Sequence, residues 1–238
     1  MRSFEKSEVN KEDIITIISF NVLTSNQNKE SVLKFIESNI KNKNKVIVLL
    51  MEINKDWSQA LIALSDNLKN NLVLPREDNS GIGIWSNIPD LKISSEEYLF
   101  ENSSMPFLKG SFRFKSKNYN FFDIHPLPPS SNFGLKQRNS MLLNIKSRIE
   151  SINSRTFIMG DFNTTPWSSI FRQNFSSFNR FPQGLLSANT WSPFRNRIIG
   201  IPIDYILTTD NFRLLDNSFI GEGFGSDHRP LVASFELR

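Results

Sequence analysis

The sequence predicts an α/β protein in which mixed β-sheets pack together and helices lie on the outside. The chain has 238 residues, 39% of them hydrophobic, which is enough for one sizeable core. Its short apolar runs are rich in β-branched residues, as strands are. Several expected strands follow one another in the middle of the chain, and this order argues against a purely parallel, strictly alternating sheet.

Strands are expected where a short apolar or alternating run is bounded by turn residues. These runs cover residues 14–20, 46–51, 71–74, 83–86, 92–100, 107–114, 119–124, 156–159, 203–207 and 231–236. The first two, IITIISF and VIVLLM, are apolar almost throughout, which is typical of strands buried on both faces.

Helices are expected where apolar residues recur at a spacing of three or four. The segments concerned are residues 31–40, 56–68, 136–152 and 167–175. In the first of them, Val32, Ile36 and Ile40 fall on one face. The polar residues 1–13 predict a frayed tail, and residues 14–238 predict a single domain because no linker or repeat divides them.

Composition excludes several kinds of site. Cysteine is absent, which excludes disulfides, thiolate metal sites and a cysteine nucleophile.

No apolar run reaches the roughly 18 residues of a membrane span, and no signal-peptide pattern opens the sequence. The net charge of +4 permits an anionic partner, but the basic residues are spread out rather than gathered as in a dedicated nucleic-acid binder.

The stretch FIMGDFNTTPW, residues 157–167, fits two descriptions. Gly160, Asp161, Asn163 and Pro166 are ordinary turn formers, so the run after the strand can be a simple turn. Asp161 and Asn163 also place a carboxylate and a carboxamide two positions apart, where they can bind a hydrated cation or a phosphate oxygen. The positions of other polar residues decide between the two.

Other expected strands also meet single polar residues at an end. The residues at these positions are Asn21, Glu52, His125, Asp161, Asp204, Asp227 and His228. Both histidines of the chain belong to this set, whereas one histidine alone would more often be structural. Rigid strands that present ligating or proton-transferring residues are a common way to hold a site, so the pattern indicates function.

Six segments in order resemble the endonuclease/exonuclease/phosphatase superfamily, which has the deoxyribonuclease-I-like fold. They are ISFNV, LLMEIN, DIHPLPP, MGDFNTTPWS, PIDYIL and GSDHRPL, and the resemblance spans nearly the whole chain. It implies a four-layer α/β sandwich: two mixed β-sheets face to face, flanked by helices, with the site at one edge. HPLPP and TPWS also resemble a bacterial branch that often carries membrane-spanning helices upstream. We therefore expect a soluble domain, either cytoplasmic or part of a membrane-anchored protein.

The resemblance implies a Mg²⁺-dependent phosphoesterase that hydrolyses phosphodiester bonds, with Mn²⁺ as a substitute ion. Glu52 resembles the principal metal ligand, and Asn21 and Asp227 resemble further residues of the metal site. His228 resembles the general base, with Asp204 orienting its ring. GDFNTTPW is then a turn and a site together.

Several roles stay open or weaker at this point. Asp161 is the alternative to His228 for activating the water. His125 is expected to contact phosphate or protonate the leaving group, and Asn163 to donate an amide hydrogen bond to phosphate. Arg138 is expected to bind substrate, because arginine suits bidentate phosphate contact. Three aromatic residues either stack on substrate or simply pack: Phe133, Trp167 and Trp191.

Nucleic acid is the first expected substrate, because the chain is mildly basic and many relatives are nucleases. A phospholipid or sphingolipid headgroup comes second and a phosphoinositide third. A non-catalytic module that binds phosphate ligands is the rival from another class. Asn21 is followed by VLTSNQ, without the acidic residue of abasic-site repair enzymes, which disfavours that repair activity. The chain is expected to be a monomer.

Overall fold

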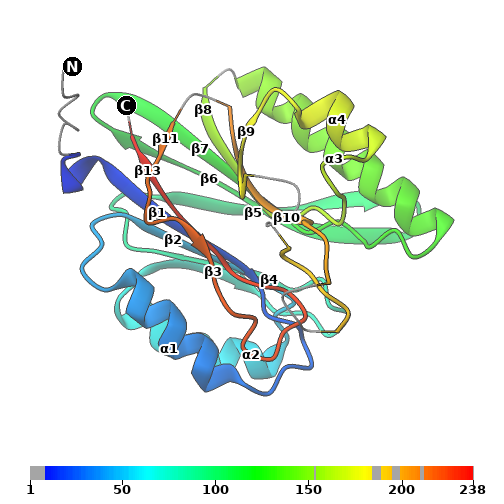
Figure 1. Cartoon of the computed structure of the whole chain (residues 1–238), viewed down its shortest axis with the longest axis horizontal. Helices are drawn as coiled ribbons and strands as arrows, with labels where there is room; N and C mark the ends of the chain where they lie inside the picture. The colour runs from blue at the N-terminus through cyan, green and yellow to red at the C-terminus, as the bar shows by residue number, and fades with distance from the viewer. Residues whose placement is uncertain (1–8, 153, 184–188, 195–198, 210–211, 238) are drawn as a thin grey trace.

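Two β-sheets lie face to face in the middle of the molecule, and helices cover their outer sides (Figure 1). The structure is a computed structural model that describes residues 9–152, 154–183, 189–194, 199–209 and 212–237. Helices α1 (Lys29–Ile40) and α2 (Lys55–Ala60) cover one sheet, and α3 (Asn132–Ile152) and α4 (Ser169–Phe175) cover the other. The predicted four-layer sandwich is confirmed, and residues 1–8 of the expected tail lie outside the described part.

Each sheet is mixed and has one parallel pair near its centre. The first has the order β11 (Arg213–Leu214), β13 (Leu231–Glu236), β1 (Ile14–Asn21), β2 (Val46–Met51), β4 (Ile82–Ser86) and β3 (Asn70–Leu74), with β12 (Phe219–Ile220) beside β13. The second has the order β5 (Lys92–Phe100), β6 (Ser103–Phe114), β7 (Lys117–Ile124), β8 (Arg155–Asp161), β10 (Asp204–Thr208) and β9 (Asn179–Phe181). The parallel pairs are β1–β2 and β7–β8, so in each sheet two carboxyl ends meet at one edge.

The alternation of side chains explains why the central strands read as continuous apolar runs. In β1, Ile15 and Ile17 join the core between the sheets, whereas Ile18 and Phe20 pack under α1 with Val32. Both faces of the strand are therefore buried, and a residue on either face has to be apolar or hydrogen-bonded.

The structure differs from the predicted elements at a few points. The helix expected over residues 56–68 is α2 followed by a 3₁₀ helix, Leu61–Asp66, in which Leu61 and Leu64 are buried. A spacing of three suits the tighter 3₁₀ turn. Lys11–Asp13 forms another 3₁₀ turn, and the Asp13 carbonyl accepts a hydrogen bond from the Leu237 amide. Strands β9, β11 and β12 were not predicted, because a run of two or three residues is too short to show the apolar–polar alternation of a strand.

Among the described residues, no helix is both long enough and apolar enough to cross a bilayer.

Gly160 sets the approach of β8 to β7 just before Asp161. Its φ is +135°, and a Cβ atom there would lie 2.0 Å from the Ile124 carbonyl oxygen. We expect Gly160→Ala to lower the free energy of unfolding by roughly 2 to 4 kcal/mol, since both backbone strain and overpacking are introduced. Urea denaturation followed by circular dichroism measures this.

The matched control is Gly221→Ala. There the nearest atom to an added Cβ is Pro230 Cγ, a side-chain atom at 2.8 Å, which has more room to shift than a backbone carbonyl. Gly221→Ala should therefore lower the free energy of unfolding clearly less than Gly160→Ala does. Equal stability of Gly160→Ala and the unchanged protein would show that this close approach is not required.

Candidate active site

The predicted site residues gather at the edge where the parallel pairs of both sheets end. Asn21 ends β1, Glu52 follows β2, His125 follows β7, and Asp161 ends β8. Asp204 begins β10 rather than ending a strand, but it is paired with Asp161 in the antiparallel register of β8 and β10. A residue that starts a strand therefore reaches the same edge as residues that end one.

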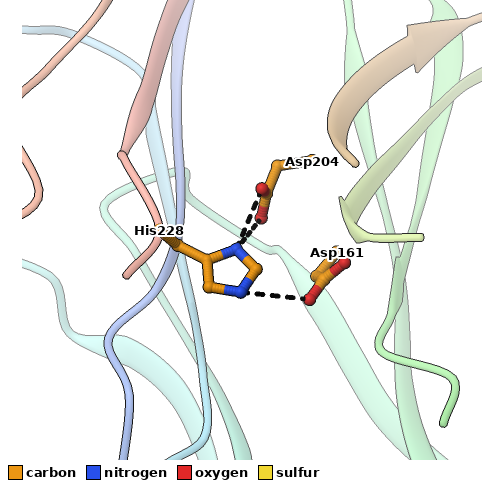
Figure 2. Close-up of side chains that lie close together, drawn as sticks. All are labelled: Asp161, Asp204 and His228. Atoms are coloured by element: carbon orange, nitrogen blue, oxygen red, sulfur yellow. Dashed lines mark hydrogen bonds and ion pairs between the residues drawn. The ribbon is translucent and has the colours of Figure 1, made fainter. Parts of the chain in front are cut away.

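His228 joins the two sheets at this edge (Figure 2). It precedes β13 of the first sheet, and its ring lies against carboxylates of the second. Nδ1 is 3.0 Å from Asp204 Oδ2 and 3.1 Å from Oδ1, while Nε2 is 3.6 Å from Asp161 Oδ2. All three side chains are buried, so the ring is held between two carboxyl groups that are shielded from water.

Two hydroxyl groups that were not predicted hold these residues in place. Ser226 Oγ donates to the Asn21 carbonyl at 2.8 Å and accepts from the His228 amide at 3.0 Å. Thr190 Oγ1 accepts from the amides of Ile203 and Asp204, each at 3.0 Å. Ser226 stands within the GSDHRPL segment and was within reach of sequence reasoning, whereas nothing in the sequence around Thr190 marks it.

Asp161 is the centre of the remaining contacts. Its Oδ1 accepts the Asn163 amide at 2.8 Å. Around Oδ2 lie Asn21 Nδ2 at 3.4 Å and His125 Nε2 at 3.7 Å, in addition to the His228 ring. Asn21 Nδ2 also donates to Glu52 Oε1 at 2.9 Å. One buried amide therefore links the carboxyl group of Asp161 to the carboxylate of Glu52.

Glu52 is held in a strained backbone conformation. Its φ is +62°, a left-handed value that is uncommon outside glycine and costs about 1 to 3 kcal/mol. The Thr24 hydroxyl donates to the Glu52 carbonyl at 3.0 Å, and the Thr24 amide lies 3.3 Å from Oε2. Asn163 also has a positive φ, +48°. Such conformations gather at functional sites, which agrees with the position of both residues.

The buried charged groups at this edge change one another's pKa values. Burial raises the pKa of Asp161 to about 8; the nearby His228 charge opposes this shift, and the carboxylates of Asp204 and Glu52 add to it. Burial would lower the pKa of His228, but the carboxyl groups of Asp204 and Asp161 outweigh it and raise the value to about 10. Burial lowers the pKa of His125. At neutral pH the site therefore holds His228 protonated and His125 neutral.

The donor set suits a hard divalent cation. Carboxylate oxygens of Glu52 and Asp161 lie on either side of the Asn21 amide nitrogen, and Mg²⁺ is commonly held by one or two carboxylates. The Asn21 Oδ1 atom accepts the Leu23 amide at 3.1 Å. Asp161, Asp204 and His228 also place ligand atoms within 4.8 Å of one another. The His228 Nδ1 atom in that group is already hydrogen-bonded to Asp204, and its Nε2 faces a carboxyl oxygen of Asp161, so the group suits proton transfer better than cation binding.

Three predicted residues lie around this centre and have other partners. Asp227 Oδ2 accepts the Trp191 indole N–H at 2.9 Å, while Oδ1 is buried without a hydrogen-bond partner among the described residues. Asn163 Nδ2 donates to the Pro126 carbonyl at 3.0 Å. Arg138 is buried, and its Nη1 donates to the Asn163 carbonyl at 2.8 Å.

Arg138 therefore supports the loop that carries Asn163. Its Nε and Nη2 atoms both donate to Asn139 Oδ1. Of the three aromatic candidates, Phe133 packs on Phe100 with ring centroids 5.7 Å apart. Trp167 is 48% exposed beside the Asn163 loop and stays available for stacking.

Comparisons with known proteins place the chain in a family. Residues 18–228 match the model of the Endonuclease/Exonuclease/phosphatase family. No curated protein matches the sequence. Truncated TDP2 from Caenorhabditis elegans superposes with a TM-score of 0.73 at 14% identity, covering 94% of this chain and 97% of that one.

Two further solved structures share the fold. SmcL has a TM-score of 0.68 at 17% identity over 94% of this chain and 99% of its own. Sphingomyelinase C from Streptomyces griseocarneus has a TM-score of 0.65 at 14% identity over 93% and 99%. The chain belongs to the Endonuclease/Exonuclease/phosphatase family, a family of hydrolases that act on phosphoesters.

Proposed function

We propose that this protein is a Mg²⁺-dependent phosphodiesterase. The observation that supports this most is the convergence of Glu52, Asn21, Asp161, His125 and the Asp204–His228 pair on one edge of the sandwich. These groups supply what phosphodiester hydrolysis requires: a cation site, a proton acceptor and donors to phosphoryl oxygens. A binding module without catalysis would not need the buried Asp204–His228 pair.

Glu52 is the main ligand of the cation in this proposal, with the Asn21 carboxamide beside it. When bound, Mg²⁺ would stabilise charge on the phosphoryl oxygens and make a water molecule more acidic. Asp227 carries a buried carboxyl oxygen without a partner among the described residues, and it is a further candidate for this site.

The pKa values at the site favour Asp161 over His228 as the group that activates the water. His228 is protonated at neutral pH and is therefore suited to donate a hydrogen bond from Nε2 to a phosphoryl oxygen. Asp161, with a pKa of about 8, holds its proton at neutral pH while no cation is bound. A bound cation would favour the ionised carboxylate, which is the form that accepts a proton from water. Asp204 stabilises the imidazolium, His125 contacts phosphate or the leaving oxygen, and Asn163 donates an amide hydrogen bond to phosphate. Arg138 supports the loop that carries Asn163.

Nucleic acid is the substrate class that we propose first. The chain carries a net charge of +4, and Trp167, four residues after Asn163 in the sequence, is an exposed aromatic side chain on which a base can stack. A phospholipid or sphingolipid headgroup is the second candidate, because one of the structural neighbours is a sphingomyelinase C.

The experiment is hydrolysis of a phosphoester panel with Mg²⁺ and with EDTA. The panel contains single- and double-stranded DNA, RNA, sphingomyelin, phosphatidylcholine and a phosphoinositide. We expect Mg²⁺-dependent cleavage of a diester. Asp204→Asn removes the charge that stabilises His228 and should lower kcat roughly 10²- to 10⁴-fold, the range for loss of acid–base assistance.

Substrate binding by Asp204→Asn should change much less than its kcat. The matched control is Glu150→Gln, which removes an exposed carboxylate paired with Lys146 on α3, far from the site edge. It should leave kcat unchanged. Hydrolysis that is equally fast in Asp204→Asn would contradict the role of the pair, and no hydrolysis of any substrate would favour the binding module.

The raised pKa of His228 predicts how stability changes with pH in the metal-free protein. Because its folded value, about 10, exceeds the unfolded value of about 6.5, its contribution is complete below pH 6.5 and is lost as pH rises toward 10. Asp161, also raised, adds to the same slope up to about pH 8. We expect urea denaturation in EDTA to give a falling free energy of unfolding between pH 6.5 and 9.

Two histidine variants separate the sources of this slope. His228→Asn should reduce the slope, because one of the two groups that take up a proton on folding is gone and only Asp161 remains. His125→Asn should retain it, since burial keeps His125 neutral in this range. A slope that survives in His228→Asn at full size would exclude the His228–Asp204 ion pair.

A further inference from the structure

Asp123 is a fully buried carboxyl group that the mechanism does not yet use. It lies in β7, and neither Oδ1 nor Oδ2 has a hydrogen-bond partner among the described residues. A buried polar group without a partner costs about 1 to 3 kcal/mol, so such groups are usually matched by another polar group or by water.

A second unmatched group lies two residues further along the chain, just after β7 ends. Nδ1 of His125 is buried and also lacks a hydrogen-bond partner among the described residues. The other ring nitrogen of His125, Nε2, faces Asp161 Oδ2 at 3.7 Å. One end of the ring therefore points into the site, and the other points back into the protein.

The alternation of β7, continued one residue past its end, places Asp123 and His125 on one face. Residues of β7 alternate: Tyr119 and Phe121 belong to the core between the sheets, whereas Phe122 and Ile124 belong to the core under α3. Asp123 follows Phe121 in this alternation, and His125 follows Asp123. Residues i and i+2 of a strand are roughly 6.6 Å apart along it, a span that a carboxyl group, one water and an imidazole nitrogen can fill.

The alternative is that Asp123 is only an unfavourable residue in the core. That leaves two unmatched polar groups two residues apart in the sequence, which one water could satisfy together. A water between them would have three polar atoms to bind, namely both Asp123 oxygens and His125 Nδ1, which is the usual number for a buried water.

We propose that Asp123 is a positioning residue for His125, which it holds through one bridging water whose hydrogen atom is donated to Nδ1. The proton of the neutral ring is then on Nε2, the nitrogen that faces Asp161 and the substrate. His125 is thereby fixed as a hydrogen-bond donor toward a phosphoryl or leaving oxygen.

The protonation of both residues agrees with this arrangement. Burial raises the pKa of Asp123 well above its ordinary value, and burial lowers the pKa of His125. A neutral carboxyl group donates to the water, and the water donates to the neutral ring. The same ring tautomer results if Asp123 is ionised, because the water then donates to both groups.

Nitrogen-15 NMR of the histidine rings tests the proposal without any substrate. The chain contains only His125 and His228, so histidine labelling gives two ring systems, and His228→Asn assigns them. In the unchanged protein, the Nδ1 resonance of His125 should be that of an imine nitrogen that accepts a hydrogen bond. Asp123→Leu should move it toward the position of an unbonded nitrogen, whereas Asp123→Asn, which keeps the polar group, should move it little.

The role in the reaction rests on the proposed function, and its test is separate. With the substrate found in the phosphoester panel, Asp123→Leu should lower kcat roughly 10-fold and Asp123→Asn should restore most of it, as for other residues that orient an imidazole. KM should change little in both variants.

Failures of the two proposals give different results. An unbonded or protonated Nδ1 in the unchanged protein overturns the inference even if Asp123→Leu does not fold. An Nδ1 resonance that stays in place in folded Asp123→Leu overturns it as well. A bonded Nδ1 that Asp123→Leu releases supports it, even in a protein that hydrolyses none of the panel.

Discussion

The site depends on the burial of several carboxyl groups in one small volume. Asp161 and Asp204 are almost fully buried, and Glu52 is joined to Asp161 through the Asn21 amide. Ionised carboxyl groups in such a place repel one another unless a cation balances them. His228 supplies one positive charge, and the raised pKa of Asp161 shows that more positive charge is favoured. A divalent cation near Glu52 would supply it.

The two sheets are required for this arrangement, because neither holds all the groups. The first supplies Asn21, Glu52 and His228, and the second supplies His125, Asp161 and Asp204. Ser226 ties the end of β1 to the His228 segment, and Gly160 lets β8 approach β7 closely. The strained backbone at Glu52 and Asn163 is a cost that the surrounding apolar cores offset.

Much of the fold and of the candidate site could be predicted from the sequence. Apolar runs such as VIVLLM gave their strand boundaries, because burial on both faces leaves a clear pattern. The set of polar residues at strand ends was also recognisable. Short strands such as Phe219–Ile220 and the 3₁₀ continuation of α2 were not predictable, because their form depends on neighbours distant in sequence. The same holds for the supporting roles of Thr190 and Arg138, which only the folded contacts reveal.

The most direct test of the account is the position of a bound divalent ion. Mn²⁺ has a measurable anomalous signal and prefers the same oxygen ligands as Mg²⁺. In crystals soaked with Mn²⁺ at neutral pH, we expect one anomalous peak bound to the Glu52 carboxylate on its Asp161 side, and no peak there in Glu52→Gln crystals. A peak bound to the His228 ring, or no peak at this edge of the sandwich, would contradict the account.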